Sequence, residues 1–330
     1  MTRWLAIAAV LAAAGTARAD EPANKGAAKD ATAIAAPDGP LDGVYERGVV
    51  EVEPSIAPIE QVQIENFLGD VRVEGHDGDR VIIHAFKRAP DDATLERLKV
   101  TLVPDPNGVV RIGSRVAAGP EMRRLAAGSV RIDLVIQAPS SAAVVGKVWN
   151  GRLSVSGMDN GADLSANEGD ISVESSSGRI VTSSAVGTQK LREIVGEVDA
   201  RGMYGEMAMD VVRGRRLAAM MHEGRVVARN VKSRTVSIQV ARGDIVIDGE
   251  PQLGGSWSIV TYRGNIEVAV AKRAAMTIRA RARRGTVKLP EAVQPARADG
   301  SGWIAGAHGA ASHPAEIEIA AQIGNIKVDW

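Results

Sequence analysis

The sequence contains no cysteine, and aromatic residues make up only 3% of it. Without thiols the chain has no disulfides, thiolate metal sites, cysteine nucleophiles or lipid-modified cysteine, so packing alone must stabilise it. The shortage of aromatic rings leaves little surface on which sugars or bases could stack, and it suits a narrow aliphatic core.

The chain also lacks an excess of either charge, with 40 basic and 40 acidic residues. Loss of Arg3 and Arg18 with a cleaved leader would leave slightly more acidic than basic residues. Such a chain has no positive field with which to hold nucleic acid, so we expect no nucleic-acid partner.

No hydrophobic run is long enough for a transmembrane helix, which needs roughly 20 residues. The longest apolar stretch runs from Trp4 to Gly15, follows Arg3 and precedes the small-residue sequence Ala17-Arg-Ala19. This pattern predicts a signal peptide at residues 1–19 and export to the periplasm or the extracellular space. Residues 20–44 are rich in Ala, Pro and Gly without periodicity, which predicts a disordered linker.

Glycine, in contrast, is abundant, with 35 residues. It opens a phrase in which aliphatic and outward-facing residues alternate, as in Gly169-Asp-Ile-Ser-Val173 and Gly243-Asp-Ile-Val-Ile247. Between Gly169 and Gly214 the glycines recur with a period of nine. That spacing is typical of one short strand followed by one tight turn.

A single such unit cannot fold alone. Two buried aliphatic side chains contribute roughly 3 to 6 kcal/mol, whereas ordering about nine residues costs on the order of 9 to 18 kcal/mol of backbone entropy. Stacking adds shared burial and ladder hydrogen bonds, with glycine at the turns. The repeat therefore predicts an all-β fold, a β-solenoid.

Two structured regions are expected. Residues 45–137 read as a small β-rich N-terminal module carrying a short helix within Asp91–Leu98, capped by Asp91 or Asp92. Residues 138–330 read as solenoid repeats with a C-terminal cap. Thr235–Val240 and Ala275–Ala280 are predicted strands without their glycine, and Leu289–His313 interrupts the repeat as a loop or cap edge.

These residues carry a family resemblance. The strand Gly69-Asp-Val-Arg-Val73, a helix after Ala89-Pro-Asp-Asp92 and the serial Gly-Asp-Ile-x-Val phrases resemble the bacterial putative-adhesin family of exported β-strand-repeat domains of unknown function, over about Val49–Trp330. The resemblance implies a right-handed β-helix or a related β-roll and an envelope role, with no catalytic residues to transfer.

Many long β-helices cleave polysaccharides, so a carbohydrate-active hydrolase or lyase is the alternative function. Such a site needs carboxylates that converge with a basic residue. The candidates are Asp199, Asp210 and Glu223 with Arg213, Arg215 and Arg225. At a nine-residue period, Glu197 and Glu206 would also be neighbours, as would Asp170 and Arg179. A solvated face of mixed charge accounts for the same residues, and we expect no catalytic site.

We expect no metal and no cofactor. The sequence His76-Asp-Gly-Asp79 offers too few carboxylates for calcium and is better explained as a turn. The other histidines are scattered without the spacing of a zinc motif. Neither a nucleophile elbow nor a phosphate-binding loop is present.

The sharpest charge feature is the basic strand Ile278-Arg-Ala-Arg-Ala-Arg283. Alternation places Arg279, Arg281 and Arg283 on one side, where they could bind an anionic ligand such as envelope glycan or lipid headgroups. The sequence thus favours a non-catalytic exported envelope protein, a scaffold or interaction module. Its partner could equally be another envelope protein, and exposed solenoid ends allow self-association.

Overall fold

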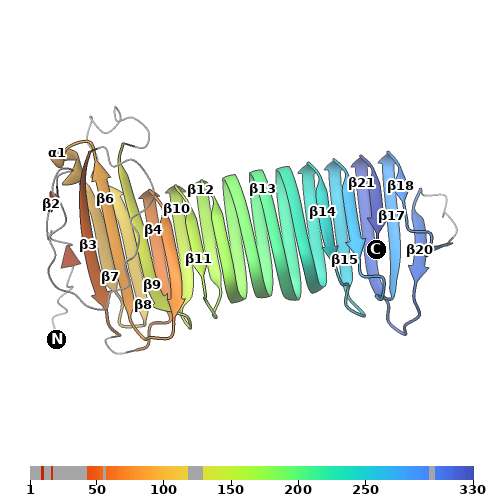
Figure 1. Ribbon diagram of the computed structural model, residues 1–330, viewed down its shortest axis with the longest axis horizontal. Helices are drawn as coiled ribbons and strands as arrows, with labels where there is room; N and C mark the ends of the chain where they lie inside the picture. Colours follow the sequence, from red (N-terminus) through yellow and green to blue (C-terminus); the bar gives the residue numbers. More distant parts are fainter. Residues whose placement is uncertain (1–8, 11–15, 18–42, 55–56, 118–128, 297–301) are drawn as a thin grey trace, which may run out of the picture.

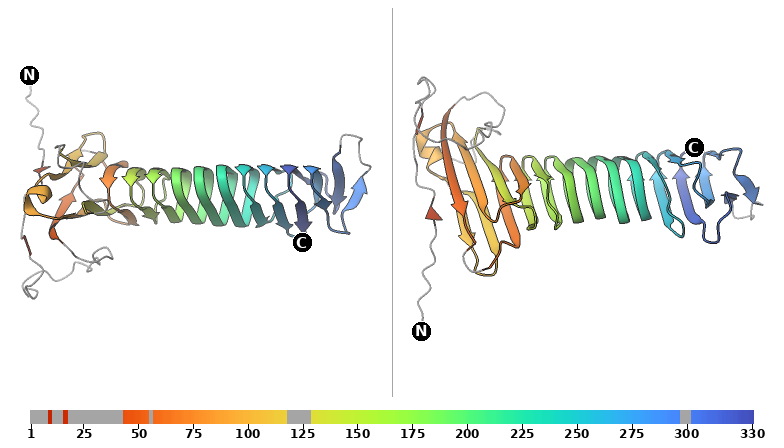
Figure 2. Two further views of the ribbon diagram at one scale, coloured as in Figure 1. Left: turned by 90° about the horizontal axis from the view of Figure 1, so that it is seen from above. Right: turned by 60° about the horizontal axis from the view of Figure 1, so that its bottom comes forward.

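The computed structural model describes residues 9–10, 16–17, 43–54, 57–117, 129–296 and 302–330 as an elongated stack of strands along one axis (Figures 1 and 2). Its one helix among these residues is α1 (Asp92–Leu95). The predicted all-β solenoid is therefore confirmed. The predicted signal peptide and linker fall almost wholly outside the described residues and stay predictions. No described helix has the length and apolarity needed to cross a membrane.

The strands form two faces around one core. Face A contains, in spatial order, β2 (Thr16–Ala17), β3 (Val44–Val52), β6 (Val81–Ala89), β9 (Arg131–Pro139), β5 (Val71–His76), β11 (Leu153–Ser156), alternate turns of β13 (Ile171–Arg242), β14 (Ile245–Gly249), β16 (Ile266–Val270), β22 (Ile326–Asp329) and β18 (Val287–Lys288).

Face B contains β1 (Ala9–Val10), β7 (Leu98–Pro104), β8 (Val109–Val116), β4 (Gln61–Leu68), β10 (Ala143–Asn150), β12 (Ala162–Glu168), the other turns of β13, β15 (Ser256–Arg263), β21 (Ala315–Ile323), β17 (Met276–Arg284), β20 (Ile304–His308) and β19 (Gln294–Ala296). One strand of each face makes one rung.

The rung repeats every 18 residues, not every nine. Leu153 pairs with Ile171 on face A, and Ala162 pairs with Ile180 on face B, both in parallel register. Successive nine-residue units therefore belong to opposite faces. The expected contact between Glu197 and Glu206 is wrong for this reason, because a side chain meets the residue one full rung away: Glu197 pairs with Arg215 at 3.3 Å. The expected contact of Asp170 with Arg179 fails in the same way, since Asp170 Oδ1 accepts from the Thr188 amide across 18 residues.

The glycines accordingly separate into two columns at the edges of the stack. One column comprises Gly69, Gly151, Gly169, Gly187, Gly205, Gly224, Gly243, Gly264, Gly324 and Gly285, and the other comprises Gly161, Gly178, Gly196 and Gly214. Each member lies directly over the backbone of the next. A Cβ at Gly205, where φ is +137°, would lie 2.0 Å from the Gly187 carbonyl oxygen. Close stacking at the edges therefore requires residues without a side chain.

Inward side chains form aliphatic ladders between the faces. Ile245, Ile266 and Ile326 are successive partners on face A, and all three are buried. Gln189 bridges the two faces inside the core: its Oε1 accepts from Thr182 Oγ1 at 2.6 Å, and its Nε2 donates to Ser184 Oγ at 2.7 Å. The interior is thus apolar, with a small polar cluster that is satisfied.

Both ends of the stack depart from chain order. At the start, β4 and β5 lie between the rung of β8 and β9 and the rung of β10 and β11. At the end, the C-terminal strands β21 and β22 lie between the rung of β15 and β16 and the rung of β17 and β18. Figure 1 shows β21 in this position, ahead of β17 along the stack. Because the parallel ladder includes β4 and β5, the proposed boundary near residue 138 does not interrupt it.

Antiparallel pairs occur at both ends of the stack. β3, β6 and β9 form an antiparallel sheet at the N-terminal end, where Lys87 Nζ and Glu46 Oε2 are 2.7 Å apart and nearly buried. α1 is capped by Asp91, whose carboxylate accepts from the Thr94 amide at 2.7 Å. It is shorter than the predicted helix because Leu98 begins β7. At the other end, β20 and β19 pair antiparallel beyond β17, within the interruption predicted over Leu289–His313.

Replacing Gly205 by Ala is expected to lower the free energy of unfolding by about 1 to 3 kcal/mol, because the substitution forces an unfavourable φ and a clash with the rung before it. Urea denaturation monitored by circular dichroism measures this change. Gly302→Ala is the control: its φ is +81°, but no atom lies within 4 Å of the added Cβ. An equal loss in both variants would contradict crowding by the column.

A third column, distinct from the two glycine columns, contains residues with left-handed backbones. Its members are Ser175, Glu193, Val211 and Asn230, with φ between 47° and 56°. Val211 is unsuited to this conformation, and Asn tolerates it. Val211→Asn should raise the free energy of unfolding by about 1 kcal/mol. Val195→Asn, at an exposed position without positive φ, should leave it unchanged in the same assay. Destabilisation by Val211→Asn alone would refute the strain at this position.

Candidate anion-binding face

The three arginines predicted to share one side of a strand lie on β17, next to the end of face B. Their inward neighbours Ile278 and Ala280 are fully buried, so Arg279, Arg281 and Arg283 project outward. The strand alternation thus places the three side chains as the sequence predicts, while their binding of an anion stays a prediction.

The ladder gives the three arginines different neighbours. Arg279 pairs in register with Glu318 of β21, and its Nη1 is 3.9 Å from the Glu318 carboxylate. Arg281 and Arg283 lie opposite the uncharged residues Ala320 and Gln322. Among the described residues neither has an ion-pair partner. Within the described part of the chain, two guanidinium groups thus have no carboxylate partner and can accept an anion.

Trp303 lies against two of these arginines, just before β20. The guanidinium carbon of Arg281 is 4.6 Å from the centre of the indole, and that of Arg279 is 5.0 Å away. Such cation–π contacts stabilise the guanidinium groups over the ring, and the groups keep their positive charge. The indole therefore helps to hold both arginines against the outer surface.

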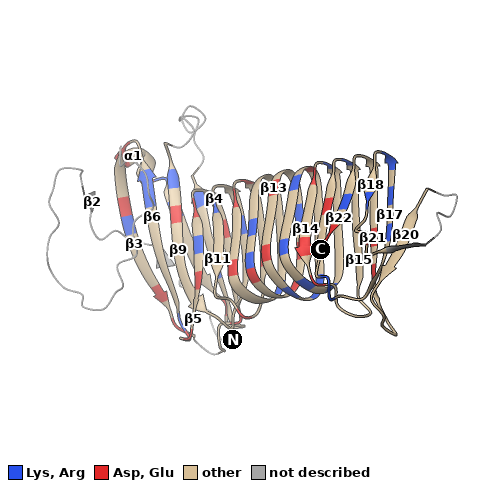
Figure 3. Ribbon diagram, turned by 45° about the vertical axis from the view of Figure 1, so that its right-hand side comes forward, with Lys and Arg blue, Asp and Glu red and all other residues tan. Residues whose placement is uncertain are grey.

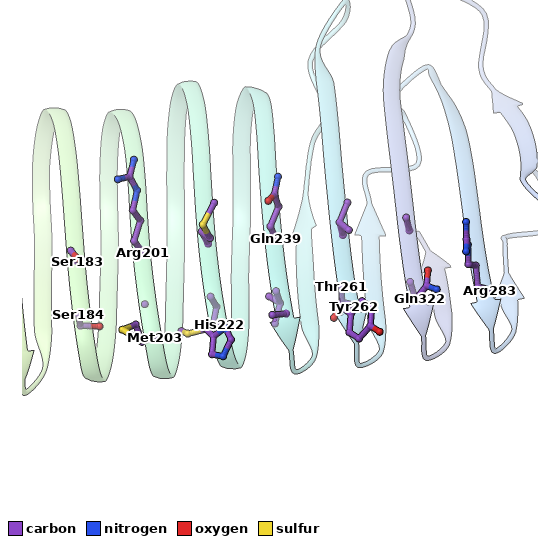
Figure 4. Close-up of a pocket in the computed structure, with 18 of the residues that line it drawn as sticks. Ser183, Ser184, Arg201, Met203, His222, Gln239, Thr261, Tyr262, Arg283 and Gln322 are labelled. Atoms are coloured by element: carbon purple, nitrogen blue, oxygen red, sulfur yellow. The ribbon is translucent and has the colours of Figure 1, made fainter.

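A shallow trough continues from Arg281 and Arg283 across face B (Figure 4). Its volume is about 660 Å³, and it extends over the neighbouring rungs past Arg201 to Ser183. Met203, Met220 and Tyr262 in its lining are each more than half exposed. The sequence analysis missed these residues because they are 17 to 59 positions apart, in strands whose pairing is visible only in three dimensions. The recurring glycines were the one signal that could have aligned them.

The carboxylates considered for catalysis are not brought together. Asp199 is on face B and pairs with Arg201 at 2.9 Å. Asp210 is on face A, where its carboxylate accepts from Asn230 Nδ2 at 2.8 Å. Glu223 is 3.5 Å from Arg242 at the edge. The candidate arginines Arg213, Arg215 and Arg225 likewise flank glycines at the two edges. Figure 3 shows acidic and basic residues interleaved along the rungs between β11 and β14.

One cluster of carboxylates does converge with an arginine, and the sequence analysis missed it because its members are far apart in the chain. Arg131 lies between Asp70 and Asp133, with nitrogen–oxygen distances of 2.6 and 2.7 Å. Asp133 also accepts from the Asp70 amide, and Asp70 accepts from the Arg152 amide at 2.7 Å. Burial raises the pKa of Asp133, whereas the hydrogen bond from the Asp70 amide and the charge of Arg131 act in the opposite direction. The cluster is internally satisfied and joins β5, β9 and β11, which is a structural role.

The histidines act in turns or lie apart. His76 Nδ1 accepts from the Gly78 amide at 2.8 Å, and Nε2 is 2.9 Å from the Arg80 carbonyl oxygen, which closes the turn between β5 and β6. Both ring nitrogens are thus engaged by the backbone. Within the described residues, no group of three or more His, Asp or Glu side chains could hold a metal ion.

Comparison with solved structures finds distant likenesses. Two are putative adhesins, one from Bacteroides fragilis (11% identity, 86% of this chain and 96% of that one, TM-score 0.41) and one from Parabacteroides distasonis (9% identity, 87% and 98%, TM-score 0.41). Another is a putative lipid binding protein from Parabacteroides distasonis (9% identity, 85% and 96%, TM-score 0.29). Among curated proteins, no relative matches this chain.

A family model covers the solenoid. The model described as Toastrack DUF4097, a domain of unknown function, matches residues 144–329, more than half of the chain. This range contains the glycine columns from Gly151 onward and the three arginines of β17. The chain therefore belongs to the Toastrack DUF4097 family.

Proposed function

We propose that the protein is a non-catalytic interaction module of the bacterial envelope, exported by its predicted signal peptide. It binds anionic envelope material through Arg279, Arg281 and Arg283. The observation that carries this proposal is the pair of guanidinium groups, Arg281 and Arg283, which lie on one outer side of β17 without an ion-pair partner among the described residues. Two adjacent cations of this kind attract an anion more strongly than isolated cations within ion pairs.

The distribution of the remaining charges supports a binding module over a polysaccharide hydrolase or lyase. A hydrolase needs two carboxylates that flank one bond, at separations of about 5 to 9.5 Å. Asp199, Asp210 and Glu223 belong to different faces and edges, and each has its own polar partner. The contacts of Asp210 and Glu223 join neighbouring rungs, and that of Asp199 lies within one strand.

Self-association is a further property to measure. On face A, β18 is two residues long and pairs only with β22 among the described strands. An edge this short offers few unpaired hydrogen-bonding groups to a second copy. Sedimentation over a range of concentrations measures whether copies associate.

The test removes the three arginines together. The variant Arg279→Ser/Arg281→Ser/Arg283→Ser should be retained severalfold less on an anionic envelope fraction at low salt, and its retention should depend less on salt, because fewer charges contribute. Retention of the purified full chain is measured against salt concentration, with circular dichroism to verify the fold.

A matched control makes the same change in net charge elsewhere. Arg213, Arg216 and Arg229 are exposed and lie on the edges or on face A. Their triple Ser variant should be retained like the wild type. If both triple variants bind equally, the proposed role of the β17 arginines is refuted.

A further inference from the structure

The two ends of the trough on face B differ: the end at β17 is cationic, and the middle is mostly apolar. The trough is lined by two rows of outward-facing side chains, each row running from rung to rung across face B. One row contains Met203, His222 and Tyr262 and ends at Arg283. The other contains Arg201, Met220 and Gln239 and ends at Arg281. Strands in a sheet are about 4.8 Å apart, so the five steps from Arg201 to Arg281 span about 24 Å.

The charge along this length is uneven. No Asp or Glu is among the described residues that line the trough. At its far end Arg201 is neutralised by Asp199, 2.9 Å away. At the near end Arg281 and Arg283 have uncharged ladder partners. An anionic group is therefore favoured at the β17 end only.

The middle of the trough is apolar and exposed. Met203, Met220 and Tyr262 expose 51%, 54% and 55% of their surfaces. Val260, on the same strand as Tyr262, pairs with Ala320 of β21. Methionine adapts its shape to flexible apolar ligands, and covering exposed apolar side chains is favourable. This part of the surface thus favours a hydrocarbon chain.

A linear anionic glycan fits this arrangement less well. Such a polymer carries charges and hydroxyl groups along its length and would need cations and hydrogen-bonding groups throughout the trough. Between Arg201 and Arg281 one row contains Met220, Gln239, Val260 and Ala320, and the other row adds His222, Tyr262 and Gln322 as its hydrogen-bonding side chains, with no further cation before Arg283. One charged end and one apolar body match an amphiphile with one head and one tail.

We propose that the trough binds an anionic lipid-like amphiphile, with its head group on Arg281 and Arg283 and its acyl chain along Val260, Met220 and Met203. This inference rests on the proposed function and names the ligand class of the same site. The bound molecule is a single amphiphile in a trough of about 660 Å³, a volume within the range of small-molecule sites.

Isothermal titration calorimetry with three soluble probes tests the inference on the full exported chain. Lysophosphatidylglycerol has an anionic head and an acyl chain, lysophosphatidylcholine has a zwitterionic head on the same chain, and glycerol phosphate has no chain. We expect saturable binding of lysophosphatidylglycerol at one site, at least about tenfold weaker binding of lysophosphatidylcholine, and no detectable binding of glycerol phosphate.

Two variants separate head from tail. Arg281→Gln/Arg283→Gln should weaken lysophosphatidylglycerol binding about tenfold or more and abolish the preference over lysophosphatidylcholine. Met220→Glu, at an exposed site, should weaken binding of both lysolipids because it places a carboxylate under the chain. The matched controls Arg216→Gln/Arg229→Gln, away from the trough, and Val195→Glu at the opposite edge should bind as the wild type does.

Several outcomes would overturn the inference: no binding of lysophosphatidylglycerol, equal binding of both lysolipids, or equally tight binding of glycerol phosphate, which would indicate an anion site only. Binding to phosphatidylglycerol vesicles without binding of the monomeric lysolipid would identify a membrane surface as the occupant. In each of these cases, arginine-dependent retention on the envelope fraction would leave the proposed function standing, so the two failures are distinguishable.

Discussion

The structure depends on the close parallel stacking of one rung on the next. Strands about 4.8 Å apart leave no space for a side chain where the chain turns at an edge. A Cβ at Gly243 would lie 1.7 Å from the Gly224 carbonyl oxygen, and the same crowding recurs along the column. Glycine at these positions allows the backbones to approach, and the aliphatic ladders of both faces then meet in one continuous core. This stacking also sets the distance between outward-facing side chains on neighbouring rungs.

Because of the stacking, the chemistry of an outward side chain is decided by the residue one rung away. Several charged side chains meet an opposite charge there: Glu174 pairs with Arg192, and Glu197 pairs with Arg215. On β17 the adjacent rung is supplied by the C-terminal strand β21. That rung gives Arg279 a glutamate, and it gives Arg281 and Arg283 an alanine and a glutamine. The insertion of β21 therefore determines which cations of β17 stay available.

Much of the architecture follows from local patterns in the sequence. The alternation in Gly243-Asp-Ile-Val-Ile247 specifies a strand and its buried side, and Asp91 specifies the start of the helix. The outward direction of Arg279, Arg281 and Arg283 is predicted by the same alternation. These features depend only on residues that are close in the chain, so a single sequence contains enough information to predict them.

The order of the rungs could not be predicted in this way. The rungs present similar small or aliphatic inward residues, so the strand next to β15 could be β17, with Ala280 facing Ile259, or β21, with Ile319 facing Ile259 as in the structure. After β16 the chain forms β17 and β18, then the terminal strands β19 and β20, and only then β21, which lies between β15 and β17. Because the core ladders would be similar in both arrangements, local patterns in the sequence do not specify the order of these strands.

The outer surface, in contrast, differs strongly between the two arrangements. Direct pairing of β15 with β17 would place Tyr262 beside Arg283 and would remove Glu318 from Arg279. The charges at the β17 end of the trough thus depend on this one long-range choice, whereas the alignment of Met203, Met220 and Tyr262 depends on the register of successive rungs. The three-dimensional structure is needed to identify both.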